Sequence, residues 1–393
     1  MLRLPRAAWQ ATTQTALDAA TAEDNLFGQA AMHISLGLIQ ADQGDPDQAL
    51  EHHARARDIS RQLGWATGEA AAIGGQGQAE WYMARLHSAH EHVTTGMRIA
   101  REAGNPYLET LGLMVTGLAC RDLGRLHEAA EQFELAISRS KWISWWDDSL
   151  ALENLGWVYW ELGRLADGLD VLAPKGVAGE TDGSRNARAT VLNAVAKINI
   201  TLGRHDEALE QAMRALARAQ DTGRLWIQAS ILNTVAAAHR ELTHFNRAMR
   251  VGSQALALAR ESRYARPEAD GLLGLSLTLK KLGRNDEART HAEQALALAR
   301  ARSFRVVEGQ ALTTLCDIAA SEQAHTKAVE LGHEALTIHR ETGHRPGEAH
   351  TLLTLAHAHQ KTDQAAAELM RRQAWDIFSD IGVPANEYED HDQ

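Results

Sequence analysis

The chain has 393 residues and a formal charge of −11, with 51 acidic side chains against 40 Lys and Arg. A nucleic-acid partner needs a basic surface that neutralises phosphates, so this composition argues against one. No apolar run approaches the length of a membrane-spanning helix, and the first twenty residues lack the apolar segment of a signal peptide. Cys120 and Cys316 lie far apart in helical patterns, which predicts buried thiols. We expect a soluble, cytoplasmic protein.

A turn-like motif recurs along the whole chain. It appears as QGDPDQAL, LGRLHEAA, LGRLADGL, LGRHDEAL and LGRNDEAR, and less typical residues hold the equivalent position elsewhere. A fixed repeat of this length is typical of stacked helical hairpins. The landmark residue of each motif lies 39 or 40 residues from the next: Gly44, Ala84, Gly124, Gly163, Gly203, Thr243, Gly283, Gln323 and Thr362.

Small residues keep the register of these landmarks. Ala or Gly stands five and twelve residues after nearly every landmark, and a small residue stands seven before it, with Lys175 and Leu355 as exceptions. Small side chains at fixed offsets indicate two helices that approach closely. Each unit therefore reads as helix, tight turn, helix and loop. A second glycine about twenty residues past the landmark suits a helix C-cap: Gly64, Gly104, Gly183, Gly223, Gly343 and Gly382.

Some segments depart from the regular unit. Residues 5–30 form a half repeat, in which 5–24 read as a second helix without its first. In the fourth unit Pro174, Lys175 and Gly176 should end the second helix early and leave a loop over 173–184, either a hinge or a tolerated repeat defect. The acidic tail 384–393 provides no polar capping helix, so the array is either part of a larger regulator or covered at its end by a partner or a second copy.

The motif L-G-R-x-x-E-A, preceded by L-G or V-A and followed by Ala seven residues later, resembles the tetratricopeptide repeat, with a period of 40 in place of 34. Phrases such as EALEQAMRALARAQDTG resemble the arrays of bacterial signal-transduction ATPase regulators of the maltose-regulator and actinobacterial antibiotic-regulator types, and those of Gram-positive peptide-pheromone receptors. The resemblance implies an all-α fold: a single right-handed α-solenoid of about nine stacked repeats over 1–393.

In repeats of this kind the residues thirteen, ten, six and three before the landmark line a concave inner surface. We call these the inner positions, and we expect them to face solvent and a ligand. They are apolar and aromatic in the first units, whereas later units bring Asn with Lys or Arg. The candidate ligand-binding residues are Trp81, Met114, Arg121, Trp157, Trp160, Asn193, Lys197, Asn233, Arg240 and Lys280; Leu118, Glu153, Asp270 and Asp317 share the same arc.

These side chains suit a peptide or a small anionic or aromatic effector. An Asn amide offers a donor and an acceptor together, as an extended peptide backbone requires, and the resemblance to pheromone receptors implies such a role for Asn193 and Asn233. The cations would bind a carboxylate, and the Trp rings would supply rigid contact area. The alternatives are a solvated helix face, Asn caps on neighbouring turns, and a self-association surface. Trp142, Trp145, Trp146 and Tyr159 are expected to pack between or within units.

No catalytic or metal-binding motif accompanies the repeats. The densest histidine groups, in HSAHEH and GHRPGEAHTLLTLAHAH, lack the HExxH or Cys–His spacing of a zinc site. GGQGQ at 74–78 lies inside a helix and is not a phosphate loop. We therefore expect no cofactor and no enzyme activity: the chain should be a binding scaffold, the sensor domain of a bacterial regulator. The alternatives are a self-associating adaptor and, more remotely, an enzyme on a helical scaffold.

Overall fold

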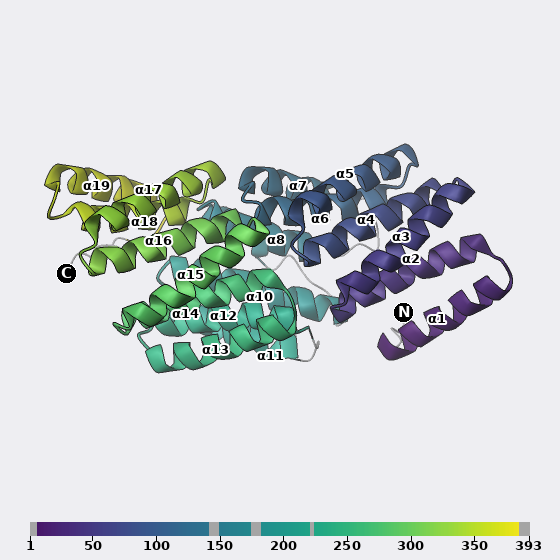
Figure 1. The fold of residues 1–393 in the computed structure, drawn as a ribbon, viewed down its shortest axis with the longest axis horizontal. Helices are drawn as coiled ribbons and strands as arrows, with labels where there is room; N and C mark the ends of the chain where they lie inside the picture. Colours follow the sequence, from purple (N-terminus) through teal and green to yellow (C-terminus); the bar gives the residue numbers. More distant parts are fainter. Residues whose placement is uncertain (1–5, 141–148, 174–181, 221–223, 385–393) are drawn as a thin grey trace. The chain divides into compact units, whose positions relative to one another are not determined.

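The computed structural model describes residues 6–140, 149–173, 182–220 and 224–384, in which every regular element is an α-helix (Figure 1). The all-α prediction is confirmed. From the second helix onward each odd-numbered helix completes a hairpin with the even-numbered helix before it. The helices are α1 (Arg6–Ala22), α2 (Leu26–Gln43), α3 (Pro46–Leu63), α4 (Ala66–Tyr82), α5 (Leu86–Glu102), α6 (Pro106–Asp122), α7 (Leu126–Ser140), α8 (Ser149–Glu161), α9 (Leu165–Leu172), α10 (Asp182–Thr201), α11 (His205–Gln220), α12 (Leu225–Glu241), α13 (Phe245–Glu261), α14 (Ala265–Lys281), α15 (Asn285–Arg302), α16 (Arg305–Ser321), α17 (His325–Thr342), α18 (Arg345–His359) and α19 (Gln364–Asp380).

The chain divides into two compact units. The first comprises residues 1–120 and 131–146, and the second comprises 121–130 and 147–393. The expectation of one continuous solenoid over the whole chain stays a prediction.

The landmark residues are left-handed turn positions. Eight of the nine, from Gly44 to Gln323, have φ between 53° and 82°, and the backbone N–H groups that follow close the end of each first helix. The exception is Thr362, after which Asp363 accepts a hydrogen bond from the Ala366 N–H and caps α19. Five landmark positions are glycine, which adopts a positive φ without steric strain. Ala84, Thr243 and Gln323 adopt the same conformation at a steric cost.

Each hairpin is packed by a complementary pair of side chains. The residue seven before the landmark faces the residue nine after it. In four hairpins a glycine at the first position leaves room for a large side chain at the second, whereas in others both residues are small, as with Ala196 and Ala212. A Cβ added to Gly117 would lie 2.7 Å from the Phe133 ring, and one added to Gly156 would lie 2.6 Å from Leu172. Where the first position is Cys316, the second is Gly332. Small residues seven before the landmark therefore allow the two helices to approach closely. The size of each is matched to the residue nine after the landmark where that residue is large.

A recurrent ion pair spans the loops between repeats. An Arg near the end of a second helix donates to a Glu eight residues later, in the first turn of the next helix, over 2.6–3.0 Å. The arginines are at least partly exposed, so each pair contributes little to stability. The pairs are Arg61–Glu69, Arg101–Glu109, Arg260–Glu268, Arg300–Glu308 and Arg340–Glu348.

In the second unit, early turns pack against segments much later in the sequence. A Cβ on Gly124 would lie 2.6 Å from Thr342, and one on Gly163 would lie 2.6 Å from Ile381, so these turns pack against loops more than 200 residues later. Helices α8 and α10 share an apolar cluster with α18, α19 and the segment after it. The last helices of the second unit therefore pack against its early helices. The buried members of the cluster are Trp157, Leu165, Leu172, Ala194, Ile198, Ala349, Phe378, Ile381 and Val383.

The irregular fourth unit is partly as expected. Helix α9 ends at Leu172, which confirms the early termination before Pro174. The expected loop lies mostly at 174–181, outside the described residues, as do Trp142, Trp145, Trp146, Lys175 and Gly223. The expectation for Gly183 is wrong, because it lies in the first turn of α10 rather than at a C-cap. Tyr159 is buried, as predicted.

Candidate functional site

The inner positions of the first unit are filled by packing. Trp81 on α4 is 5% exposed and Met114 on α6 is 3% exposed. The expectation that these side chains face solvent is wrong, because neighbouring helices cover them. Their role in ligand binding therefore stays a prediction.

In the second unit the structure brings together Arg121, Trp157, Trp160 and Lys197. The Lys197 ammonium lies 3.8 Å from the Trp157 ring centre and 5.0 Å from that of Trp160. The two rings are edge-to-face at 6.0 Å, and the Trp160 indole N–H donates to Thr201 over 2.7 Å. Trp157 is only 8% exposed, which contradicts a solvent-facing ring. Lysine and tryptophan thus form a rigid, desolvated cation–π contact.

Beside this contact lies a buried charge cluster centred on Arg266 at the start of α14. Its guanidinium donates to Asp122 over 3.0 Å, to Glu161 over 3.1 Å and to Asp270 over 3.3 Å. Arg121 donates to Asp122 over 3.0 Å and to Asn154 over 2.9 Å. We call the set Arg121, Asp122, Glu161, Arg266 and Asp270 the Arg266 cluster. It joins the end of α6 to α8 and α14 within the second unit.

Burial shifts the protonation equilibria of this region. Desolvation raises the pKa of Glu153 on α8 to about 7, against the opposing effects of the Thr190 hydrogen bond and the charge of Arg121. Desolvation lowers the pKa of Lys197 to about 8, although Asp270 and Glu161 act in the opposite direction. Burial also raises the pKa of Glu161 despite its contact with Arg266. The site therefore holds an amine and a carboxyl group that titrate near neutrality.

The two aligned asparagines have different roles. The Asn233 amide donates to the Pro267 carbonyl over 3.0 Å and so binds the first turn of the next inner helix. Asn193, one turn before Lys197 on α10, is 3% exposed and its Oδ1 has no hydrogen-bond partner among the described residues. The Trp157 Nε1 and one Glu153 carboxyl oxygen are likewise buried without a protein partner. Asn233 fits the capping alternative, whereas Asn193 keeps an unused acceptor.

The other predicted cations are already paired. Arg240 contacts Glu241 at 2.8 Å, and Lys280 forms an ion pair with Asp317 of the next inner helix. Lys197 differs from both, since no carboxylate of the described residues lies within ion-pair distance of it. Sequence reasoning missed Asp122, Glu161 and Arg266. Arg266 stands in the column of Tyr107 and Trp226, which Arg345 also shares, and its partners lie 105 and 144 residues away, so no local pattern indicates its role.

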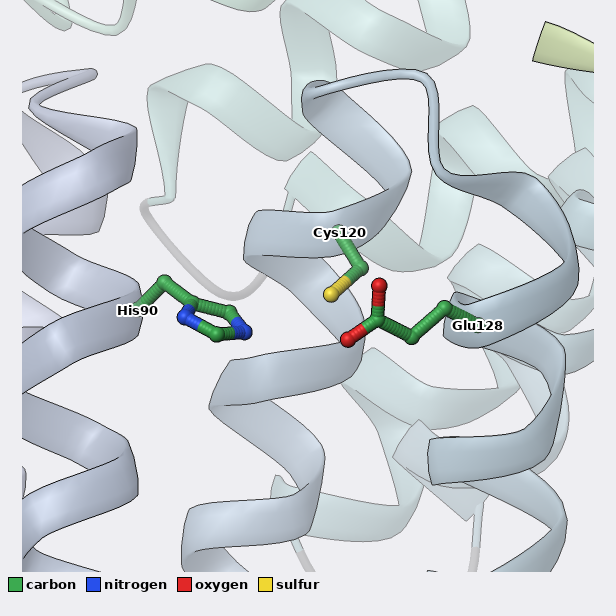
Figure 2. A group of neighbouring side chains, drawn as sticks. All are labelled: His90, Cys120 and Glu128. Atoms are coloured by element: carbon green, nitrogen blue, oxygen red, sulfur yellow. The ribbon is translucent and has the colours of Figure 1, made fainter.

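One group of possible metal ligands occurs among the described residues: His90 on α5, Cys120 on α6 and Glu128 on α7 (Figure 2). His90 and Cys120 belong to the first unit and Glu128 to the second. We assign no metal site to it. In the same HSAHEH segment of α5, His92 contacts Glu80 at 2.7 Å. In the described part of the chain no helix has both the length and the apolarity to cross a membrane.

Comparison with known proteins supports the repeat. A family model described as "Tetratricopeptide repeat" matches residues 269–302, which include the hairpin turn at Gly283. No curated protein matches the chain. The chain thus carries a tetratricopeptide repeat, as the motif predicted, and the solved structures below show the same fold.

Three solved structures illustrate that fold. A Rap protein complexed with Competence and Sporulation Factor has a TM-score of 0.62 at 13% identity, covering 90% of this chain and 98% of that one. The Rap conjugation gene regulator of plasmid pLS20 with the Phr* peptide has a TM-score of 0.60 at 16% identity, covering 72% and 77%. NprR with its cognate peptide NprX has a TM-score of 0.57 at 13% identity, covering 88% and 98%. At these identities the likeness establishes the helical-repeat fold alone.

Proposed function

We propose that this chain is a regulatory binding domain that takes a short peptide on the inner surface of its second unit. Two of the solved proteins that share its fold are held in complex with named peptides. The observation that carries the proposal lies in this chain itself. Among the described residues, the Trp157 Nε1 on α8 and the Asn193 Oδ1 on α10 are buried without a hydrogen-bond partner, and the Lys197 ammonium, one turn after Asn193, lies on the Trp157 ring face.

Unused polar groups in a buried setting are costly to a protein. Leaving one hydrogen-bonding group unsatisfied costs about 1–3 kcal/mol, so a cluster of them at neighbouring positions needs a reason. A peptide supplies both N–H donors and carbonyl acceptors, which match the mixed set of donors and acceptors here. The Trp157 and Trp160 rings would add rigid contact area with little loss of side-chain entropy.

In this proposal the effect of the ligand is regulatory and not catalytic. A ligand bound at Trp157 would act on the packing of the last helices, because this tryptophan belongs to the apolar cluster with α18 and α19. Binding would then bias the closure of the second unit, to the extent that the ligand prefers one arrangement. This is the sensor role expected of a regulator's repeat domain.

The test is affinity selection from a pool of synthetic short peptides, read by mass spectrometry. The wild type should retain a subset that Asn193→Ala and Trp157→Phe lose by about ten-fold or more, the loss expected for one hydrogen bond in a desolvated site. Met213→Ala, at a half-exposed position on α11, is the matched control and should retain the same peptides. Thermal unfolding of each variant separates lost binding from lost fold.

Retention of no peptide by the wild type above the level of the variants would contradict the proposal. The self-associating adaptor is the second candidate, and one observation favours it. Trp9 on α1 and Phe27 on α2 are 41% and 55% exposed. Light scattering over a concentration series would then show a mass that grows with concentration, and Phe27→Ser would suppress that growth.

A further inference from the structure

We propose that His339 and His344 form a pH-sensitive switch in the second unit, in which acidification releases the turn between α17 and α18 from α8 while the rest of the unit stays folded. The inference goes beyond the proposed function, because it requires no peptide. It rests on the contacts of two buried imidazole rings that lie on either side of Gly343, and on the segments that this turn contacts.

The turn between α17 and α18 is a place where a late part of the second unit contacts an early part. The His344 ring lies edge-to-face on the Trp160 ring of α8, with ring centres 6.4 Å apart. A Cβ added to Gly343 would lie 3.1 Å from the His127 Nε2 and 3.3 Å from the Leu162 side chain. The turn is therefore packed against the first turn of α7 and against the end of α8 and the residue after it.

The two imidazole rings have room for one proton between them. Their Nδ1 atoms lie 3.1 Å apart, so one Nδ1 carries a hydrogen and the other accepts it. Protonation of both rings would place two N–H groups face to face at this distance. The His344 Nε2 is buried without a partner among the described residues, so an N–H at that position also lacks an acceptor. His339 is 0% exposed and His344 is 2% exposed, which separates both rings from bulk water.

The surroundings of the pair do not compensate a positive charge. The Nδ1 of His350 donates to the Pro346 carbonyl over 2.7 Å, so this third ring contributes no acceptor. Each carboxylate near the pair already accepts from an arginine. The charged and titratable groups on the elements packed against the pair and the turn are His127 of α7, Glu161 of α8, Arg266 of α14, Arg305 and Glu308 of α16, Arg340 and Glu341 of α17, and Arg345, Glu348 and His350 of α18.

The protonation equilibria agree with this geometry. Burial, and after it the neighbouring His350, lowers the pKa of His339 to about 3. Burial, His339, His350 and Arg266 all lower the pKa of His344 well below its ordinary value. An imidazole in water is protonated below about pH 6.5, so both rings gain protons when the turn is released. Acid therefore stabilises the released turn relative to the packed turn, and the effect begins as the pH falls below 6.5.

Hydrogen exchange followed by mass spectrometry tests the proposal on the whole chain. Measurements at pH 6 and pH 5, each corrected for the intrinsic exchange rate at that pH, give the opening constant of the segment 339–348. If release exposes both histidines, this constant should rise about 60-fold between pH 6 and pH 5, against about 8-fold for one histidine. Residues 271–281 of α14, which contain no histidine, provide the internal control and should change much less.

Substitutions test the assignment to these two rings. His339→Gln and His344→Gln each remove one titrating group, so each should reduce the rise to about 8-fold, and the double variant should abolish it. His333→Gln, at an exposed position on α17, is the matched control and should keep the rise of the wild type.

Three results would overturn the switch. The first is an opening constant of 339–348 that stays the same in the wild type at pH 6 and pH 5. The second is an equal rise in 271–281, which would mean that the unit unfolds as a whole. The third is an undiminished rise in the double variant, which would assign the acid response to other groups.

Discussion

At the scale of single residues, the left-handed turn is occupied by glycine in some repeats and by residues with a side chain in others, and only the latter are strained. Gly203 and Gly283 hold φ near 73° and 72°, and Thr243 adopts 58° in the equivalent turn between them. A β-branched side chain in this region is strained, because its Cβ lies close to the following carbonyl oxygen. The strain is local, since each turn is closed by its own backbone hydrogen bonds.

Thr243→Gly is expected to stabilise the second unit by about 0.5–1 kcal/mol. The left-handed penalty of ~1–2 kcal/mol is removed, and the greater flexibility of unfolded glycine offsets part of that gain. Urea denaturation at neutral pH measures the change. Gly283→Ala is the matched control, because its added Cβ meets nothing within 4 Å and only the backbone is strained. It should lose about 1 kcal/mol. A Thr243→Gly variant no more stable than the wild type would contradict the strain argument.

At the scale of the helix pair, packing depends on two columns and not on one. Gly117 on α6 leaves room for the fully buried Phe133 ring on α7, and both residues belong to the first unit. In another hairpin the order is reversed, with Cys316 before the turn and Gly332 after it. Close packing therefore couples the two positions, so a larger residue at one requires a small residue at the other.

Gly117→Ala should destabilise the first unit by about 1–3 kcal/mol through overpacking against Phe133. Phe133→Leu alone should also destabilise it, by leaving unfilled space. The double variant should be more stable than the sum of the two losses predicts, because each change relieves the other. A double-mutant cycle by chemical denaturation measures this coupling. Strictly additive losses would show that the two side chains do not share the space.

At the scale of the whole second unit, the Arg266 cluster links segments that are distant in sequence. Arg266 contacts Asp122 across 144 residues and Glu161 across 105. A buried charged cluster of this kind adds little net stability over an apolar core, but removing one member leaves the others uncompensated. We expect the cluster to favour one arrangement of α6, α8 and α14, because other arrangements would leave its buried charges unpaired.

Arg266→Met should therefore destabilise the second unit by about 3–5 kcal/mol, since three carboxylates lose their guanidinium. The control is Arg372→Met, whose exposed pair with Glu368 should contribute less than about 1 kcal/mol. Urea unfolding at neutral pH compares the two. Losses of equal size would mean that the cluster is no more important to the fold than a surface ion pair.

Acid should weaken both units through buried histidines. Desolvation lowers the pKa of His53 in the first unit to about 4 and that of His339 in the second to about 3. Above pH 6.5 both rings are neutral in the folded and unfolded states. As the pH falls below 6.5, these histidines become protonated in the unfolded chain but stay neutral in the folded chain. The free energy of unfolding therefore decreases until the pH reaches the pKa of the folded state.

The loss at pH 5 should be about 2 kcal/mol for each histidine. Denaturation at pH 7, 6 and 5 measures the slope for the wild type and for His53→Gln and His339→Gln. Each glutamine variant should show a shallower loss, because its side chain does not titrate. A slope unchanged by both substitutions would assign the acid sensitivity to other groups.

The repeat, the helices, the turns and the buried small columns follow from the sequence, because each depends on residues within about forty positions of one another. Helical periodicity places Ala208 and Ala215 on the packed face of α11 without knowledge of any distant contact. The inner positions could be identified in the same way. Arg121, Trp157, Trp160 and Lys197 were all expected on the arc that the second unit brings together.

Only the tertiary structure decided whether that arc is open or closed. Gly124 and Gly163 pack against Thr342 and Ile381, which lie more than 200 residues later in the chain. No sequence pattern within one repeat indicates contacts over this separation. The sequence places Lys197 and Trp157 at inner positions of successive units, whereas only the fold shows that they are in contact and buried, and that Arg266 pairs with the carboxylates beside them.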